Sequence, residues 1–232
     1  MTDEHAVARI ARFWEARARE SALRFSIPGA PGGPAGVDQL AFAASGRDLL
    51  DAAAELVDWR PSHLSLAVDV GCGAGRLLEP LSRLSDAVIA VDIAPTMIEA
   101  AREVHGHRDG FSWLVGHAGA LDGIADAAAD AVLAIGVLAH LPTQALQLEA
   151  LAELARVLLP GGAALFDLRD RPLPLELPGE SAVPDRIARH PLWRGVPLDL
   201  ETLAGAAAEE GLELERIAGS GSGRCLVLAR RA

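Results

Sequence analysis

Between residues 64 and 168, short apolar runs alternate with longer segments in which apolar residues recur every three or four positions. The short runs predict strands at residues 66–70, 87–92, 111–115, 131–135 and 163–168. The longer segments predict helices near residues 75–84, 95–104 and 143–158. Strands that are apolar on both faces and separated by helices are typical of a parallel sheet covered by helices on both sides.

The end of the chain predicts a different arrangement. A helix is expected at residues 199–210, followed by two apolar runs at 212–218 and 225–229. The glycine-serine segment 219–223 joins these runs, which together predict a β-hairpin. An antiparallel pair is therefore expected at one edge of the sheet.

The first 60 residues lack the alternation of strands and helices. Residues 5–25 carry apolar side chains at helical spacing with charged residues between them, and predict an amphipathic helix. A second helix is predicted at residues 37–58, after a segment so rich in proline and glycine that neither helix nor sheet persists. We interpret residues 1–60 as a helical cap with its linker and residues 61–232 as the main α/β domain.

Residues 169–198 hold six prolines, and the segment is too long for a simple connector in a compact domain. It is either disordered or a functional cover. Because it follows the last predicted parallel strand, it would overhang the carboxyl ends of the strands, where open α/β sheets bind their ligands. We therefore expect residues 169–198 to cover the substrate.

The stretch with the clearest chemistry begins at the end of the first predicted strand and reads Asp69-Val70-Gly71-Cys72-Gly73-Ala74-Gly75-Arg76. Alternating glycines let the backbone approach a ligand closely, which indicates a nucleotide-like cofactor. Arg76 stands where a dinucleotide fingerprint has its third glycine, and no Gly-Lys-Ser/Thr of a phosphate-binding loop follows. The next strand ends at Asp92, whose carboxylate can accept both hydroxyls of a ribose.

Four motifs occur in the order found in class I S-adenosylmethionine-dependent methyltransferases: Asp69 with its glycine loop, Asp92, Gly116-His117-Ala118, and the segment 154–162. The chain resembles this family well over about residues 45–168 and more loosely to its end. The resemblance implies an α/β, Rossmann-like, doubly wound and mostly parallel seven-stranded sheet with an antiparallel C-terminal hairpin. It also implies S-adenosyl-L-methionine as the cofactor.

The resemblance further implies which residues hold the cofactor. The expected set is Asp69, Gly71, Cys72, Gly73, Gly75, Asp92, Ile93, Met97, His117, Ala118, Gly136 and Val137. Asp69 would orient the loop or reach the amino group of the cofactor, and Ile93 would lie against adenine. His117 replaces the acidic residue usual in the family, so either imidazole and backbone groups or Asp122 would read the adenine. For Asp92, a cap on the following helix is the alternative role.

His140 follows the fourth predicted strand and is the candidate general base, since the unperturbed pKa of histidine lies near neutrality. The alternative is a histidine that fixes the loop before the next helix. Methyl transfer requires mainly positioning and exclusion of water, so a metal or a side-chain nucleophile is not needed. The candidate substrate-facing residues are Trp14, Arg17, Arg169, His190 and Trp193. The N-terminal helix that carries the first two could alternatively only pack on the domain.

Composition restricts the partners and the setting. The 232 residues include 21 Lys and Arg against 32 Asp and Glu, and the net charge of −11 opposes binding to nucleic acid or anionic lipid. The two cysteines lack metal-ligand spacing, so neither a metal site nor a disulfide framework is expected. No run approaches the roughly 18 apolar residues of a membrane helix. The acidic N-terminus is unlike a signal peptide, so we expect a cytoplasmic monomer or homodimer.

These observations predict a methyltransferase that moves a methyl group from S-adenosylmethionine to oxygen, nitrogen or carbon of a small-molecule metabolite by in-line transfer. The alternative is a regulatory or non-catalytic protein of the same fold that binds the same cofactor. A nicotinamide-dependent oxidoreductase is disfavoured by Arg76 in place of the third glycine.

Overall fold

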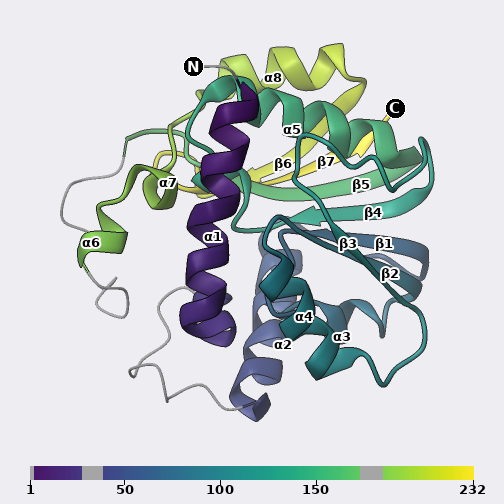
Figure 1. The fold of residues 1–232 in the computed structure, drawn as a ribbon. Helices are drawn as coiled ribbons and strands as arrows, with labels where there is room; N and C mark the ends of the chain where they lie inside the picture. Colours follow the sequence, from purple (N-terminus) through teal and green to yellow (C-terminus); the bar gives the residue numbers. More distant parts are fainter. Residues whose placement is uncertain (1–2, 28–38, 173–184) are drawn as a thin grey trace.

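The computed structural model of the chain describes residues 3–27, 39–172 and 185–232. Within these residues one seven-stranded sheet has the strand order β3-β2-β1-β4-β5-β7-β6 (Figure 1). Its strands are β1 (Leu64–Val70), β2 (Ser85–Asp92), β3 (Phe111–Val115), β4 (Ala129–Ala134), β5 (Leu158–Leu168), β6 (Leu212–Ala218) and β7 (Cys225–Arg231).

The strand pairing confirms the predicted sheet. β1 pairs in parallel with both β2 and β4, and the parallel arrangement continues outward to β3 and to β5. β7 runs antiparallel to β5 and to β6, as the predicted hairpin requires. The strand order reverses between β1 and β4, and a crevice for ligands opens at such a switch point, beyond the carboxyl ends of the strands.

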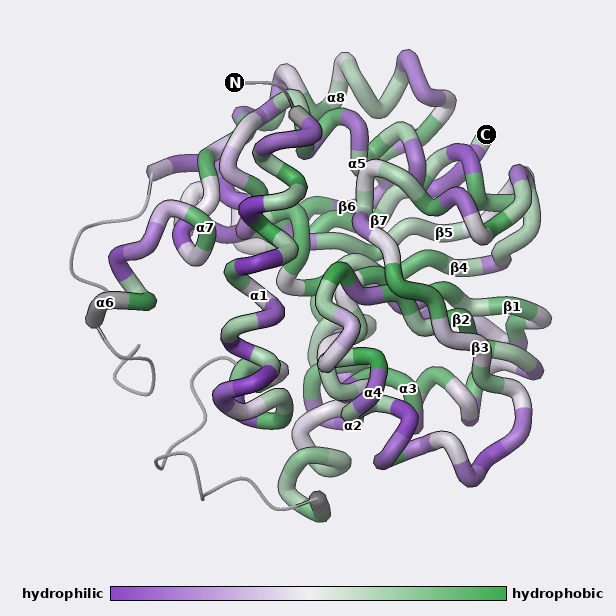
Figure 2. Tube along the Cα trace, viewed as in Figure 1, coloured by the Kyte–Doolittle hydropathy of each residue, from purple (hydrophilic) through white to green (hydrophobic). Residues whose placement is uncertain are grey.

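Helices cover both faces of the sheet, with α5 and α8 on one side and α2, α3 and α4 on the other (Figure 1). The helices are α1 (Asp3–Phe25), α2 (Gln39–Leu56), α3 (Leu78–Leu81), α4 (Pro95–His105), α5 (Gln144–Val157), α6 (Asp185–Ala188), α7 (Pro191–Arg194) and α8 (Leu200–Glu209), with the 3-10 helix η1 at Leu138–His140. Figure 2 shows hydrophobic colour along the strands and alternating hydrophobic and hydrophilic patches on α1. The apolar stripe predicted for the N-terminal helix packs in a buried cluster with residues of α4, α6 and α7.

The helix predicted near residues 75–84 is wrong in its length, because α3 has four residues. Gly75 has a φ of +86°, which a right-handed helix does not contain, so the chain stays in turns until Leu78. The helix then ends before Ser82 and the chain enters β2 at Ser85.

Gly46, in the middle of α2, is a weak point for a helix when only the sequence is considered. In the structure an ideal Cβ on Gly46 would lie 1.9 Å from the carbonyl oxygen of Arg76. The missing side chain therefore lets α2 approach the glycine loop. The predicted start of this helix at residues 37 and 38, and residues 28–36 of the proline-rich linker, lie outside the described residues.

The segment predicted as a substrate cover is described at residues 169–172 and 185–198, and residues 173–184 lie outside the described part. The short helices α6 and α7 carry Ile187, Leu192 and Trp193 into an apolar cluster with α1 and α4. This packing places residues 187–193 beside α1, at the end of the sheet where the strands of the switch point terminate (Figure 1).

Candidate active site

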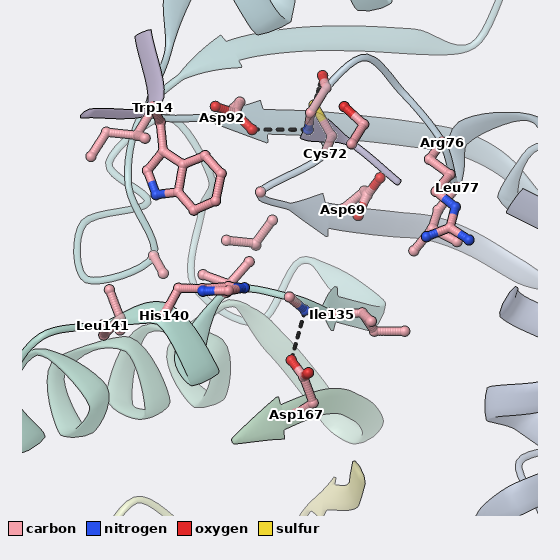
Figure 3. A pocket seen from close by; sticks show the side chains of 18 of the residues that line it. Trp14, Asp69, Cys72, Arg76, Leu77, Asp92, Ile135, His140, Leu141 and Asp167 are labelled. Carbon is pink, nitrogen blue, oxygen red and sulfur yellow. Dashed lines mark hydrogen bonds between the residues drawn. The ribbon is translucent and has the colours of Figure 1, made fainter. Parts of the chain in front are cut away.

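A cavity of about 600 Å³ lies at the carboxyl ends of β1, β2, β4 and β5. Residues of α1, α2, η1, α7 and the β6–β7 hairpin complete its walls, so segments far apart in the sequence enclose one space (Figure 3). The lining is mostly apolar, with carboxylates at Asp69, Asp92 and Asp167. A mainly apolar cavity with a few convergent polar groups is the usual form of a small-molecule site.

The glycines after β1 all have positive φ, at +72° for Gly71, +55° for Gly73 and +86° for Gly75. An ideal Cβ on Gly71 would lie 2.3 Å from Cγ2 of Val137, and one on Gly73 would lie 2.4 Å from Oγ of Ser26. The loop therefore needs glycine for its conformation and for close packing against other parts of this chain. Gly71, Cys72 and Gly73 line the cavity, whereas Gly75 packs against His105.

Asp92, at the end of β2, is 7% exposed and lines the cavity. Its carboxylate accepts hydrogen bonds from the backbone N–H of Gly73 and from the N–H of Ala94, each at 2.9 Å. Ala94 is the N-cap residue of α4, so Asp92 supports the start of that helix, which is the alternative role considered for it. Asp92 has this contact and lines the cavity at the same time. Burial raises the pKa of Asp92 to about 6, although the hydrogen bonds from Ala94 and Gly73 act in the opposite direction.

Asp69, at the carboxyl end of β1, is 2% exposed and lines the same cavity. Burial, and then the neighbouring charge of Asp92, raise the pKa of Asp69 to about 8. Two buried carboxyl groups therefore face one space, and within the described part of the chain neither forms an ion pair with an arginine or lysine. A positively charged ligand in this cavity would favour the ionised form of both groups.

Four further residues of the predicted cofactor-binding set line the cavity: Ile93, Met97, His117 and Ala118. The Nδ1 atom of His117 accepts a hydrogen bond of 3.2 Å from the N–H of Gly119, so this ring fixes the turn that forms part of the wall. Asp122, the proposed substitute for the missing acid, is exposed and not among the lining residues.

His140, in η1, is buried and lines the cavity. Its Nδ1 lies within hydrogen-bond distance of the carbonyl oxygen of Trp193, and a carbonyl can only accept. The proton of the neutral ring is therefore on Nδ1, and Nε2 remains an acceptor. Burial, followed by the charge of Arg224, lowers the pKa of His140 to about 4, so the ring is neutral near pH 7.

Two of the predicted substrate-facing residues, Trp14 and Trp193, line the cavity. The ring of Trp14 is 5.5 Å from that of His140 and 5.7 Å from that of Trp193. His140 and Trp193 are 5.2 Å apart, so the three rings form one aromatic wall.

The other three predicted substrate residues do not line the cavity. Arg17 lies over the ring of Phe13, at 5.1 Å, and pairs with Glu20. The ring of His190 stacks on the same Phe13 ring, with the two centroids 4.5 Å apart. Arg169 is buried and donates from Nε to the carbonyl oxygen of Ala139, at 3.0 Å, which supports η1 from behind.

Helix α1 is fixed over the cavity at two points. Glu15 accepts hydrogen bonds from the hydroxyl of Thr96, at 2.7 Å, and from the N–H of Thr96, at 3.1 Å, at the start of α4. Ser26, just after α1, accepts the N–H of Ala74 at 2.8 Å. The hydrogen bonds from Thr96, chiefly the one from its hydroxyl, lower the pKa of Glu15. Together, the contacts of Glu15 and Ser26 tie α1 to α4 and to the glycine loop.

The structure also brings in residues that the sequence analysis did not select, among them Asp167, Arg224, Arg76 and Ser26. Asp167 stands near the end of a predicted strand, a position at which the other carboxylates were selected, so a signal existed for it. Arg224 and Ser26 follow no recognisable motif, and only the folding of the chain places them at the cavity.

Residues 68–166 match the family model described as a methyltransferase domain. The ubiquinone biosynthesis O-methyltransferase of Methylocella silvestris is 47% identical over 83 residues, which cover 35% of this chain and 32% of that protein. The protein of the same name from Xylella fastidiosa is 36% identical over 108 residues, covering 46% and 42%. The chain thus spans less than half the length of these curated relatives.

Solved structures share the fold. CalS10, an amino pentose methyltransferase from Micromonospora echinaspora with bound S-adenosylmethionine, has a TM-score of 0.60 at 20% identity and covers 85% of this chain and 93% of its own. The N-methyltransferase NodS from Bradyrhizobium japonicum, in complex with S-adenosyl-L-homocysteine, has a TM-score of 0.59 at 19% identity, covering 91% and 99%.

Two features are absent from the described residues, 3–27, 39–172 and 185–232. None of their helices is long and apolar enough to cross a membrane. Their His, Cys, Asp and Glu side chains do not form a group of three or more that could hold a metal ion.

Proposed function

Because this chain carries a class I S-adenosylmethionine-dependent methyltransferase domain, we propose that it transfers a methyl group from S-adenosylmethionine to an oxygen atom of a small-molecule acceptor. The match of residues 68–166 to the methyltransferase domain model and the strand order of the sheet confirm the resemblance that the motifs indicated. Of the three acceptor atoms left open by the sequence, oxygen is favoured by the name of the curated relatives.

The single observation that carries the proposal is the pair of buried carboxyl groups in one cavity. Asp69 and Asp92 are both nearly inaccessible, and burial raises the pKa of each. S-adenosylmethionine carries a sulfonium and an ammonium group, so its charge fits a site that disfavours two uncompensated anions. The cavity volume of about 600 Å³ is in the range of small-molecule sites.

We assign the parts of the cofactor by chemistry. Asp92 accepts the ribose hydroxyls, and Ile93 with Met97 lies against the adenine. Asp69 pairs with the ammonium group, because its ionised carboxylate carries the opposite charge. Arg76 lines the cavity beyond Asp69 (Figure 3) and takes the carboxylate. Two of its guanidinium nitrogens, Nε and Nη2, donate to Ser45 at 3.1 Å, and among the described residues no hydrogen bond involves the third, Nη1.

When bound, S-adenosylmethionine supplies an electrophilic methyl carbon. The chain then has to orient the acceptor, exclude water and accept a proton where the acceptor carries one. Trp14 and Trp193 provide an apolar wall, and α1 closes the cavity through its contacts with Thr96 and Ala74. Nε2 of the neutral His140 can accept a hydrogen bond from an acceptor hydroxyl. Because burial and the charge of Arg224 lower the pKa of His140 to about 4, a proton that reaches this atom passes on to water.

The experiment has two stages. Titration calorimetry should show binding of S-adenosylmethionine and S-adenosylhomocysteine and no binding of NAD. The protein is then incubated with methyl-labelled cofactor and a metabolite extract, and the expected result is label in a small molecule. Cofactor binding without any labelled product would favour the regulatory alternative, and tight NAD binding would contradict the proposal altogether.

A further inference from the structure

An ion pair stands at the side of the cavity away from Asp92. Asp167, in β5, is 4% exposed and accepts the N–H of Gly136 at 2.6 Å (Figure 3). Its other carboxylate oxygen contacts both Nε and Nη2 of Arg224, the residue that precedes β7. An ideal Cβ on Gly136 would lie 3.8 Å from Nη2 of Arg224, so the guanidinium is beside the end of β4.

The guanidinium group of Arg224 uses only part of its hydrogen-bonding capacity in its contact with Asp167. Asp167 uses the edge formed by Nε and Nη2, and within the described part of the chain no contact is assigned to Nη1. The side chain is 39% exposed and is among those that line the cavity. A guanidinium with one edge fixed by a buried carboxylate presents its other edge in a defined direction, and this geometry suits a carboxylate.

The charges around His140 point to the same kind of ligand. After burial, the two causes that lower the pKa of His140 are the positive charges of Arg224 and Arg169, while Asp167 acts in the opposite direction and less strongly. The potential at this ring is therefore positive. An acceptor with an ammonium group would be repelled here, whereas an anionic acceptor would be attracted.

The shape of the wall adds a second feature. The rings of Trp14, His140 and Trp193 lie 5.2–5.7 Å from one another and face the same cavity. Aromatic side chains of this kind provide large flat apolar contact area. An acceptor with a planar apolar body fits this wall, with its charged end directed to Arg224 and its hydroxyl toward His140.

We propose that Arg224 is a specificity residue that selects hydroxy-aromatic acceptors bearing a carboxylate and rejects amines. This inference rests on the proposed function. In the reaction the acceptor oxygen forms a bond to the methyl carbon as the sulfur–carbon bond breaks, the sulfur leaves as a neutral thioether, and the hydroxyl proton passes by way of Nε2 of His140 to water.

The test uses full-length protein saturated with S-adenosylhomocysteine and three probes of similar size: 4-hydroxybenzoate, 4-hydroxybenzamide and 4-hydroxybenzylamine. Calorimetry should show that the benzoate binds about tenfold or more tightly than the amide, and that the amine does not bind. Binding of the amine in preference to the benzoate, or equal binding of all three probes, or binding of none, would overturn the proposal.

Substitutions then assign the effect to Arg224. Arg224→Met leaves Asp167 buried without its partner, so the double variant Asp167→Asn/Arg224→Met is made as well, because it removes both charges and keeps an oxygen for the N–H of Gly136. Both variants should lose the preference for benzoate over amide, and Arg224→Lys should keep part of it. Arg216→Met is the control, since Arg216 is exposed on β6 and contacts the carbonyl oxygen of Glu215.

The affinity for S-adenosylhomocysteine separates this proposal from the proposed function. It should be unchanged in the double variant. If it falls strongly, Arg224 holds the carboxylate of the cofactor and the proposal is wrong. If the unsubstituted protein does not bind S-adenosylhomocysteine at all, the proposed function itself fails.

Discussion

The carboxylate of Asp92 accepts the backbone N–H of Gly73 at 2.9 Å, which ties the end of β2 to the glycine loop that follows β1. Its second oxygen is held by the N–H of Ala94, so the carboxylate is oriented from two sides. Each oxygen has a further lone pair available. The group can therefore meet two ribose hydroxyls without rearranging, which is the form of preorganisation that favours tight binding.

Asp92→Ala is expected to weaken binding of S-adenosylhomocysteine by about tenfold or more, since each hydrogen bond to a charged group contributes roughly 1.5–3 kcal/mol. Calorimetry at constant pH measures the effect. Asp86→Ala is the matched control, because Asp86 lies on the same strand with a 70% exposed side chain. Equal loss in both variants, or no loss in Asp92→Ala, would contradict the ribose assignment.

The two buried carboxyl groups predict that cofactor binding releases protons. Burial raises the pKa of Asp92 to about 6 and that of Asp69 to about 8, so both groups are partly protonated near neutrality. A cationic ligand favours the ionised forms, so the affinity for S-adenosylmethionine should rise between about pH 6 and pH 8. Calorimetry in buffers with different ionisation enthalpies measures the released protons directly.

The same groups set the sign of the pH dependence of stability. In the unfolded chain an aspartate has a pKa near 4, so between about pH 4 and pH 8 the folded protein holds protons that the unfolded chain releases. Stability contributed by these groups is therefore present at low pH and is lost as the pH rises through about 6 and about 8. Thermal unfolding without ligand should show this decline, and Asp69→Asn should remove its upper part. A decline that is unchanged in Asp69→Asn would assign it to other groups.

Gly71→Ala separates backbone strain from close packing. Gly71 has a φ of +72° and its added Cβ would lie 2.3 Å from Val137. Gly161 has a similar φ of +79° with nothing within 4 Å of the Cβ, so it is the matched control. Gly161→Ala should cost roughly 1–2 kcal/mol of unfolding free energy, and Gly71→Ala should cost roughly 1–3 kcal/mol more. Denaturant unfolding measures both, and equal costs would show that Val137 yields without strain.

Arg76→Met is expected to weaken binding of S-adenosylhomocysteine and to leave binding of adenosine unchanged, because only the former carries a carboxylate. Burial lowers the pKa of Arg76, against the influence of Asp48, so its charge is costly to keep without an anionic partner. Ser45→Ala, which removes one of its two hydrogen bonds to Ser45, should give a smaller effect in the same direction. An equal loss for adenosine would indicate a purely structural role.

The imidazole of His140 is expected to titrate well below the usual range of histidine. Burial and the charges of Arg224 and Arg169 lower its pKa to about 4, so its ring stays neutral through the physiological range. Heteronuclear NMR of the imidazole Cε1–H signal, assigned by comparison with His140→Gln, gives the value. An inflection between pH 6 and pH 7 for this signal would contradict the buried, cation-flanked environment.

The sequence determined the α/β class, the parallel direction of the central strands and the glycine loop, because those depend on local apolar periodicity and on the conformational freedom of glycine. It did not determine which side chains share the cavity. Arg17 and Trp14 lie three residues apart on one helix, yet only Trp14 faces the cavity, since a helix presents different residues to different neighbours.

Tertiary structure alone decided the pairing of Asp167 with Arg224 and the contact of Ser26 with Ala74. These partners are separated by 57 and 48 residues, and no spacing rule connects them. Strand order puts β7 beside β5 and so brings Arg224 to Asp167. The packing of α1 on α4 brings Ser26 to the glycine loop. Local periodicity predicts the helices and strands. Which charged and polar groups become buried, and which partners they find, is decided only when those elements pack together.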